Sequence, residues 1–567
     1  MPAESRRDFI LLATSLASAA AGLAARGAEA EPSQLLRTPA PPSEITLNTI
    51  AESERLLGLS FTDDERAQIL KSLGEHHNLV ASANKDLPND LAPATVFSPR
   101  LPGRPTPPVT AVGDPAALPN DVPPLPANDG DIAYAPLTTL ACWIRDRAIT
   151  SARLTELYLQ RIERFSPRLL CCITVTADLA RAQAKVADAD IASGRWRGPL
   201  HGIPYGLKDI IDTKDIPTTW GAEPWRERVP RTDAWITTRL RAAGAVLVAK
   251  TAVGALAYGD IWFGGKCRSP WNRQRGSSGS SAGSASGISA GLFGFAIGTE
   301  TLGSIVSPAD RCGAAGLRPT FGRVPRTGAM SLVWTMDKIG VLCRSISDTA
   351  LVLAAINGQD DGDPSSVEQP FTFDHAQSAR GLLVGYDPMW TRDNPYADVA
   401  RAAVEAAREE GCEVIEIGMP RMDSRPTIFH LYAEAAAAFD RMTRDNADDQ
   451  LSWQDDAAWP NVFRRSRFFS AVDLVQCDRI RRQRCNAMHS LFDELDAVLA
   501  PPFAGDLLIH TNWTGQPCAV FRAGFNSSNE PQAMTVMSQI FDEGTALRIA
   551  SALERRLGHW QRRPELD

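Results

Sequence analysis

The sequence has few residues that could bind a metal ion or cross-link the chain. It contains ten cysteines and eight histidines in 567 residues. Only Cys171 and Cys172 lie close together, and neither a CxxC pair nor a zinc-type Cys/His spacing occurs. The adjacent histidines, His76 and His77, stand in a polar helical stretch, which favours a surface position. The sequence therefore predicts neither a metal centre nor a disulfide scaffold.

Positive charge is also scarce. There are 59 basic against 67 acidic residues, a formal net charge of −8, and no long Lys/Arg run. Because a nucleic-acid surface needs a basic footprint with interleaved aromatic residues, we expect no nucleic-acid partner. The composition, 44% hydrophobic and 22% charged, is that of a globular protein. At about 150 residues per domain, the length alone predicts three to four domains.

No apolar run reaches the about 20 residues that a membrane span requires. The stretch Leu11 to Ala25 is short and rich in Ala, Ser and Gly. It follows Ser5-Arg6-Arg7-Asp8-Phe9-Ile10 and precedes the small residues Ala28-Glu29-Ala30, which resembles a twin-arginine export signal. An ordinary secretory signal or a membrane anchor is the alternative. We expect cleavage of residues 1–30, a periplasmic location and no stable membrane association afterwards.

Composition divides the rest of the chain into three parts. Residues 31–98 carry apolar residues spaced among charges, which predicts a helical N-terminal extension. Residues 99–130 are rich in proline, which is typical of a linker that runs along a surface or acts as a spacer. Residues 131–567 form the main body, as one domain rather than three or four.

Helical and strand-like segments alternate in the body. Helices are expected at Ser151 to Phe165, stopped by Ser166-Pro167, and at Asp178 to Ser193. The order strand, helix, strand then occurs twice, which predicts an α/β body with helices covering a sheet. These two units are Gly202 to Asp209, Asp233 to Ala243 and Ala245 to Val248, then Leu382 to Val384, Ala397 to Glu410 and Cys412 to Ile417.

Glycine and serine are concentrated in one segment, Gly276 to Gly316, with ten glycines and nine serines in 41 residues. Core-type residues such as Phe293 and Ile297 interrupt it, so a tight substrate loop is favoured over a flexible linker. Two short motifs have little weight. Gly279 to Gly283 matches G-x-S-x-G but lacks the preceding strand of a nucleophile elbow, and Ser82 to Lys85 matches S-x-x-K without its companion elements.

Four ordered blocks resemble the amidase signature family over roughly residues 133 to 560. The resemblance implies an amidase-signature fold: a large twisted mixed β-sheet with helices on both faces. It implies no metal or organic cofactor. A homodimer is left open. The blocks are His201-Gly-Ile-Pro-Tyr-Gly-Leu-Lys-Asp209, Gly279-Ser-Ser-Ala-Gly283, Gly298-Thr-Glu-Thr-Leu-Gly-Ser-Ile305 and Cys312-Gly-Ala-Ala-Gly-Leu-Arg-Pro-Thr-Phe-Gly-Arg-Val324.

The resemblance implies a Ser-Ser-Lys triad in which Ser304 is the nucleophile, Ser280 the bridging serine and Lys208 the base. A serine hydroxyl is a weak nucleophile that needs a neighbour to take its proton. A lysine can do so only when neutral, which requires a pKa well below about 10.4. The alternative for Lys208 is a surface lysine paired with Asp209. In the family the bridging serine follows a cis peptide bond.

The same resemblance assigns the oxyanion hole to the backbone N–H groups of the turn Thr301, Leu302, Gly303 and Ser304. Gly279 and Ser281 are assigned to the substrate loop. The turn departs from the family pattern Thr-Asp-x-Gly-Gly-Ser-Ile-Arg at three positions: Glu300 stands for Asp, Leu302 for the first Gly and Val306 for Arg. We expect Glu300 to lack the cation that the arginine would supply, and Leu302 to adopt a turn conformation that glycine usually occupies.

These observations predict an exported serine amidohydrolase that cleaves an amide carbon–nitrogen bond of a small molecule. One alternative is the glutaminase-type subunit of a tRNA-dependent amidotransferase, which the export signal disfavours. The other is a ligand-binding homologue whose chemistry the changes at Leu302 and Val306 have impaired. The substrate stays open among peptide, aliphatic and aryl amides, carbamates and lactam-like oligomers.

Overall fold

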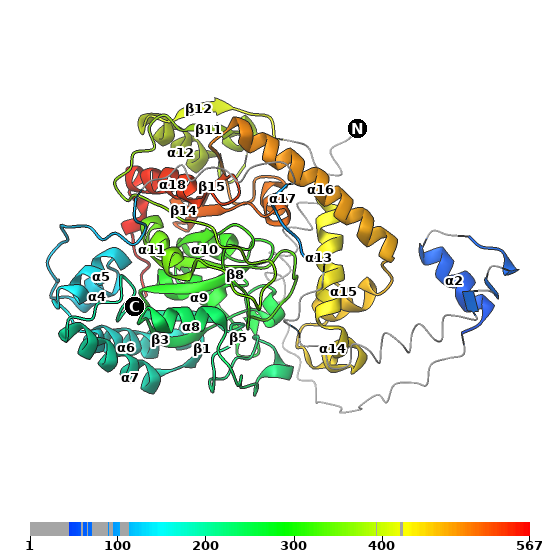
Figure 1. Ribbon diagram of the computed structural model, residues 1–567, viewed down its shortest axis with the longest axis horizontal. Coiled ribbons are helices and arrows are strands. Elements are labelled where there is room, and N and C mark those ends of the chain that lie inside the picture. The colour runs from blue at the N-terminus through cyan, green and yellow to red at the C-terminus, as the bar shows by residue number, and fades with distance from the viewer. Residues whose placement is uncertain are drawn as a thin grey trace.

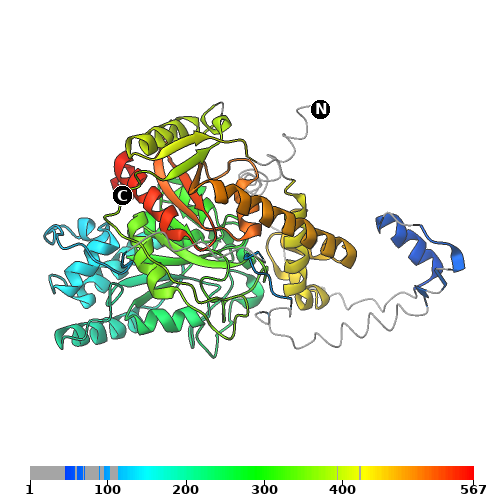
Figure 2. The same cartoon turned by 45° about the horizontal axis from the view of Figure 1, so that its top comes forward.

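The computed structural model describes residues 45–57, 60–64, 66–67, 69–70, 89, 95–101, 113–392, 394–419 and 423–566. The export signal and the His76–His77 pair lie outside these residues. None of the described helices is both long and apolar enough to span a membrane. In Figures 1 and 2, helix α2 (Leu47–Leu57) lies apart from the body.

One 11-stranded mixed sheet forms the centre of the body, in the order β1-β3-β2-β8-β10-β9-β14-β15-β13-β11-β12. Two small two-stranded ribbons, β4–β5 and β6–β7, form sheets of their own. The strands are β1 (Cys172–Val175), β2 (Pro204–Lys208), β3 (Val246–Thr251), β4 (Ile261–Trp262), β5 (Gly265–Lys266), β6 (Arg268–Ser269), β7 (Asn272–Gly276), β8 (Phe295–Glu300), β9 (Ala315–Arg318), β10 (Lys338–Cys343), β11 (Leu383–Tyr386), β12 (Glu413–Glu416), β13 (Ala497–Ala500), β14 (Cys518–Phe525) and β15 (Pro531–Ser538).

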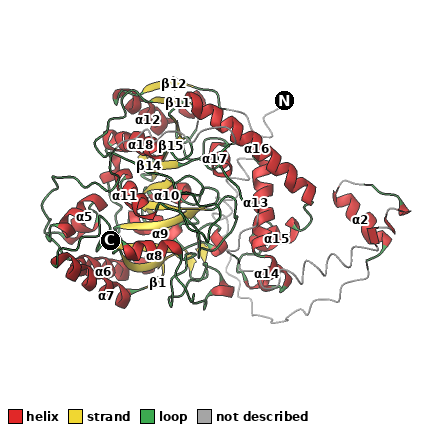
Figure 3. Cartoon of the chain, viewed as in Figure 1, coloured by secondary structure: helices red, strands yellow, loops and turns green. Residues whose placement is uncertain are grey.

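Helices cover both faces of this sheet (Figure 3). Helices α9 and α10 pack on one face, and α11, α12 and α18 on the other. The helices of the body are α4 (Asp129–Ala133), α5 (Leu137–Arg145), α6 (Ser151–Leu169), α7 (Ala177–Ala192), α8 (Trp235–Ala242), α9 (Ala282–Ser289), α10 (Val306–Cys312), α11 (Ile346–Ile356), α12 (Ala397–Glu409), α13 (Arg425–Ala438), α14 (Asp440–Arg444), α15 (Trp459–Ser466), α16 (Ala471–Glu494), α17 (Leu507–Thr514) and α18 (Glu543–Leu557).

The central strands send alternate side chains into two hydrophobic cores. Phe295 and Ile297 of β8 join one core, whereas Ala296 between them joins the other. Because successive side chains of a strand point to opposite faces, a strand buried on both sides is mostly apolar, as in Phe295 to Ile297, with the charged Glu300 only at its end. The predicted large mixed sheet with helices on both faces is confirmed.

The predicted stop of a helix at Ser166-Pro167 is wrong. Helix α6 continues through Pro167 to Leu169 and ends at Leu170, which adopts the left-handed conformation. Pro167 lies in the last turn, so its missing N–H removes only one hydrogen bond near the end of the helix. The local cost is therefore small, and the helix continues for two residues beyond the proline.

Part of the N-terminal segment packs against the body. The Asn89 side chain donates to the Ser331 carbonyl at 3.1 Å and accepts from the Ser331 N–H at 2.7 Å. Pro99 and Leu101 are buried. The indole of Trp143 donates to the Pro123 carbonyl at 2.8 Å. The described part of the proline-rich stretch therefore runs along the surface of the body.

Candidate active site

Lys208 is the last residue of β2 and is fully buried. Its Nζ lies 2.8 Å from Ser280 Oγ and 3.1 Å from Ser281 Oγ. It also lies 2.7 Å from Thr299 Oγ1 and 3.3 Å from the Thr299 carbonyl. Strands β2 and β8 are parallel neighbours, so Lys208 and Thr299 come together where both strands end. A ring of neutral oxygens therefore surrounds the amine.

Burial lowers the pKa of Lys208 to about 7, although the nearby carboxylates of Asp337 and Glu300 act in the opposite direction. Desolvation penalises the charged ammonium, and no carboxylate among the described residues pairs with it directly. A large share of Lys208 is consequently a neutral amine near pH 7. Its two hydrogens can go to Ser281 Oγ and Thr299 Oγ1, which leaves the lone pair for the Ser280 hydroxyl.

Asp209 does not pair with Lys208. Its carboxylate lies 3.2 Å from Nζ of Lys250, and both side chains are fully buried. Asp209 also accepts from the hydroxyl of Thr219 at 2.6 Å. The alternative of a surface lysine paired with Asp209 is therefore wrong, because Lys208 is neither at the surface nor bound to that acid.

Ser280 and Ser304 lie on two different loops, which hydrogen bonds hold next to each other. The N–H of Ser281 donates to the carbonyl of Ser304 at 3.1 Å, and the hydroxyls of Ser278 and Ser307 lie 2.5 Å apart. The Gly279–Ser280 peptide bond is cis. No hydrogen bond of the Ser304 hydroxyl occurs within the described part of the chain. Contacts of this kind are often loose without substrate and tighten when it binds.

Gly279 and Ser281, assigned to the substrate loop, have different surroundings. Ser281 is fully buried and holds Thr299 from both sides: it accepts from the Thr299 N–H at 3.1 Å and donates to the Thr299 carbonyl at 3.0 Å. It thereby orients the residue that contacts Lys208. A side chain at Gly279 would overlap the Gly259 carbonyl, so only glycine fits there.

The turn between β8 and α10 presents unpaired backbone donors. Within the described residues, the N–H groups of Leu302, Gly303 and Ser304 have no hydrogen-bond acceptor. The left-handed conformation falls on Gly303, with φ +88°, and not on Leu302. The expectation that Leu302 adopts a backbone conformation usually occupied by glycine is therefore wrong: its φ is not positive, and its side chain packs on the hydrophobic core.

Glu300 fixes the end of this turn that leads into α10. One carboxylate oxygen accepts from the N–H groups of Ile305 at 2.7 Å and Val306 at 2.9 Å. The other accepts from Arg318 and from Asn512, both at 2.8 Å. Although burial alone would raise it, Arg318 and the two backbone donors hold the pKa of Glu300 below its ordinary value. The expectation that Glu300 lacks a cation is wrong, because Arg318 supplies it.

The side chain of Thr301 fixes the start of the turn. Its hydroxyl donates to the Asp337 carboxylate at 2.6 Å, and the other oxygen of Asp337 accepts from the N–H groups of Leu332 and Val333. The turn is thus anchored at both ends, through Thr301 and through Ile305–Val306. Its middle residues keep their N–H groups free, which is the arrangement an oxyanion site needs.

A sequence profile of the amidase family matches residues 153–523. The chain belongs to the amidase family. A glutamyl-tRNA(Gln) amidotransferase subunit of Roseiflexus sp. (strain RS-1) is 32% identical over 466 residues, covering 74% of this chain and 95% of that protein. The peptide amidase of Stenotrophomonas maltophilia has a similar structure, with a TM-score of 0.68, 27% identity and coverage of 76% and 99%.

A further structure, of a 6-aminohexanoate cyclic dimer hydrolase bound to substrate, superimposes with a TM-score of 0.67 at 22% identity, over 76% of this chain and 99% of that one. At this identity the likeness concerns the fold alone. Membership of the family makes this protein an enzyme that acts on carbon–nitrogen bonds.

Four further residues belong to the site that the sequence did not indicate: Thr299, Arg318, Asn512 and Asp337. One signal was available for Arg318: a charged residue that directly follows the apolar residues of β9, and is buried with them, needs a buried partner. Within the described residues, no three His, Cys, Asp or Glu side chains gather as a metal site.

Proposed function

We propose that this protein is an amidohydrolase that cleaves an amide carbon–nitrogen bond through an acyl-enzyme on Ser304. The observation that carries the proposal is the buried Lys208 amine, with a pKa of about 7, at 2.8 Å from Ser280 Oγ. A neutral lysine next to a bridging serine supplies the base that a serine nucleophile lacks.

In the proposed acylation, Ser304 Oγ attacks the amide carbon and its proton passes to Ser280, which gives its own proton to Lys208. The N–H groups of Leu302, Gly303 and Ser304 stabilise the oxyanion of the tetrahedral intermediate. The carbon–nitrogen bond then breaks, and Lys208 returns the proton through Ser280 to the leaving amine or ammonia. Ser304 remains bound to the acyl group.

In the proposed deacylation, water attacks the acyl carbon and loses a proton through Ser280 to Lys208. The bond between the acyl carbon and Ser304 Oγ breaks, and the same proton returns to Ser304. The products are a carboxylic acid and a free serine hydroxyl, so the reaction consumes one water. The same residues act as base and then as acid in each half.

The test is a panel of simple aryl, alkyl and peptide amides, with glutamine included, incubated with purified protein and with Ser304→Ala. We expect ammonia or amine release by the wild type on at least one amide and none by the variant. Turnover by Ser304→Ala at the wild-type rate would exclude Ser304 as the nucleophile.

The amidotransferase components found among the relatives favour a second candidate, the glutaminase-type subunit of a tRNA-dependent amidotransferase. The resemblance of residues 1–30 to a twin-arginine signal favours the exported amidase instead. Cell fractionation separates the two: the exported amidase is expected in the periplasmic fraction, shortened by about 30 residues, whereas copurification with cytoplasmic partner proteins would reverse the ranking.

A further inference from the structure

A cavity of about 500 Å³ lies at the opposite ends of the two helices that begin at the serine loops. Ile288 and Ser289 at the end of α9 line it, as do Gly313 and Ala314 after α10. Helix α9 has eight residues, so at 1.5 Å per residue the cavity lies about 12 Å beyond its Ser280 end. The cavity is therefore separate from the candidate active site.

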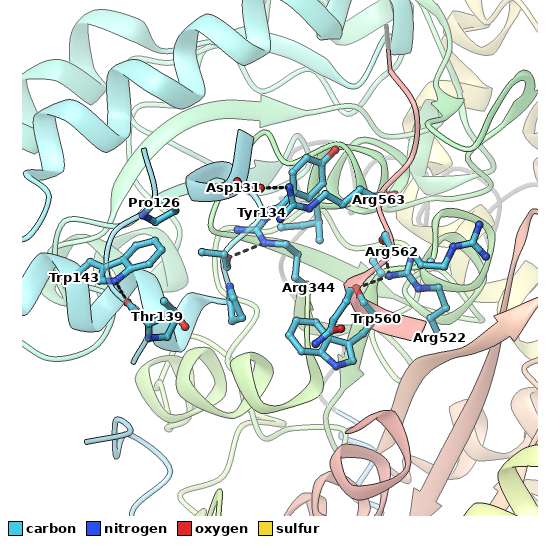
Figure 4. A pocket seen from close by; sticks show the side chains of 18 of the residues that line it. Pro126, Asp131, Tyr134, Thr139, Trp143, Arg344, Arg522, Trp560, Arg562 and Arg563 are labelled. Atoms are coloured by element: carbon cyan, nitrogen blue, oxygen red, sulfur yellow. Dashed lines mark hydrogen bonds and ion pairs between the residues drawn. The ribbon is translucent and has the colours of Figure 1, made fainter. Parts of the chain in front are cut away.

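Guanidinium groups dominate the polar lining of this cavity. Four arginines and one carboxylate line it: Arg344, Arg522, Arg562, Arg563 and Asp131. Figure 4 shows Arg563 bound to Asp131, with the other three arginines around the same hollow. The Arg563–Asp131 distance is 2.6 Å, so one positive charge is neutralised.

The other three arginines donate to neutral groups. Arg344 donates to the carbonyls of Ala135 and Phe293, at 3.0 and 2.9 Å. Arg522 donates to the Arg562 carbonyl at 2.9 Å, and Arg562 donates to the Asn529 side chain at 2.7 Å. In the part of the chain that the structure describes, no carboxylate lies within 4.0 Å of these three guanidinium groups.

Two buried acids, Asp348 and Glu554, interact with these arginines and offset only part of their positive charge. Asp348 interacts electrostatically with Arg344. Glu554 interacts with Arg522, but burial raises the pKa of Glu554 to about 8, so most of it is neutral at pH 7. Arg522 and Arg562 are thus left with little counter-charge, next to a hollow open to solvent.

Apolar side chains also line the cavity: Pro123, Pro126, Trp143, Ile288 and Ala314. In Figure 4, Pro126 and Trp143 lie on the side away from Arg522 and Arg562. A cavity lined by both guanidinium groups and apolar side chains fits a molecule with an anionic head and an apolar body. The volume falls within the range of about 300–1,000 Å³ typical of small-molecule sites. We propose that this cavity is a second binding site, for a small organic anion with a carboxylate head and an apolar body.

The test is calorimetric titration of the full-length Ser304→Ala protein with hexanoate, hexanamide, acetate and inorganic phosphate. The substitution prevents hydrolysis of the amide ligand. We expect hexanoate to bind at least tenfold more tightly than neutral hexanamide, which lacks the charge, and than acetate or phosphate, which lack the tail. Equal affinity for hexanoate and any of the other three would overturn the proposal, as would an absence of hexanoate binding.

Substitution of two exposed arginines tests whether hexanoate binds in this cavity. Arg562→Gln combined with Arg563→Gln removes two charges and frees the Asp131 carboxylate to repel the ligand, so hexanoate affinity should fall at least tenfold. Arg556→Gln is the matched control, because Arg556 is an exposed arginine on α18 that pairs with Glu410 and does not line the cavity. An equal loss in control and double variant, or no loss in the double variant at unchanged melting temperature, would contradict the proposal. Failure of amide hydrolysis leaves this result unaffected.

Discussion

The carboxylate of Glu300 accepts a hydrogen bond of 2.8 Å from the guanidinium of Arg318, and both side chains are fully buried. The arginine lies 18 residues beyond the acid, on β9, whereas the family pattern has one at the position of Val306. The same carboxylate caps the N–H groups of Ile305 and Val306, next to Ser304. The pair therefore positions the turn that carries the proposed nucleophile.

Glu300→Gln should lower kcat by up to about 100-fold, at the lower end of the about 100-fold to 1,000-fold loss caused by removing one oxyanion donor. A glutamine can accept on one atom only, so its amide N would face either Arg318 or the Ile305 N–H. The measurement is kcat and kcat/KM on an amide that the wild type hydrolyses.

The matched control is Glu543→Gln, because Glu543 pairs with Arg323 in an equally buried ion pair and accepts from the Thr320 N–H at 2.8 Å. Glu543→Gln should lower the free energy of unfolding about as much as Glu300→Gln does, but should leave kcat much closer to the wild-type value. Equal kcat losses in both variants would show a general effect of destabilisation instead of positioning.

Arg318→Met should destabilise the protein by about 3–5 kcal/mol, because it leaves the charge of Glu300 buried without a cation. Adding Glu300→Gln to this variant removes that charge and should recover part of the loss. Denaturant unfolding of both variants measures the difference. A double variant less stable than Arg318→Met would contradict the assigned pairing.

Activity should rise with pH through an acid limb near pH 7. The proposed base is neutral Lys208, whose pKa burial lowers to about 7, so protonation below that value removes the base. The profile of kcat/KM between pH 5 and 9 measures it. A flat profile over this range would mean that no group with such a pKa serves as the base.

Thr299→Val should shift that limb to lower pH and reduce kcat. The Thr299 hydroxyl lies 2.7 Å from Lys208 Nζ, and losing an acceptor disfavours the ammonium form, which lowers the pKa of Lys208 further. Thr535→Val is the control, since its buried hydroxyl donates to the Ala500 carbonyl, away from Lys208. A limb that stays in place in Thr299→Val would contradict this role.

Leu302→Gly should destabilise the protein by at least about 0.5–1 kcal/mol, since Leu302 has an ordinary backbone conformation and packs on the core. Chemical unfolding measures this change. Stabilisation by glycine would instead mean that Leu302 is held in a strained turn.

The sequence could predict the elements and residues that local patterns specify. Lys208, Ser280 and Ser304 stand in ordered blocks, and the structure brings Lys208 next to Ser280 and joins the backbones of Ser281 and Ser304. The alternation of strands and helices likewise predicted the layered α/β body, because periodicity reports which faces are buried.

What the sequence could not predict depends on contacts distant along the chain. Asn512 reaches Glu300 across 212 residues, and Asp337 reaches Thr301 across 36. Val306 in place of arginine indicated that Glu300 lacks a cation. Arg318 takes that role only because β9 folds beside the turn. The end of α6 was misjudged because Pro167 falls in a last turn, where a lost hydrogen bond costs little.

The central claim is an activated Ser304, and labelling with a fluorophosphonate probe tests it most directly. Mass spectrometry of the digested protein should find the adduct on Ser304, and Lys208→Ala should lose labelling while it keeps the wild-type circular dichroism spectrum. An unlabelled wild-type protein, or an adduct on another serine, would contradict the account.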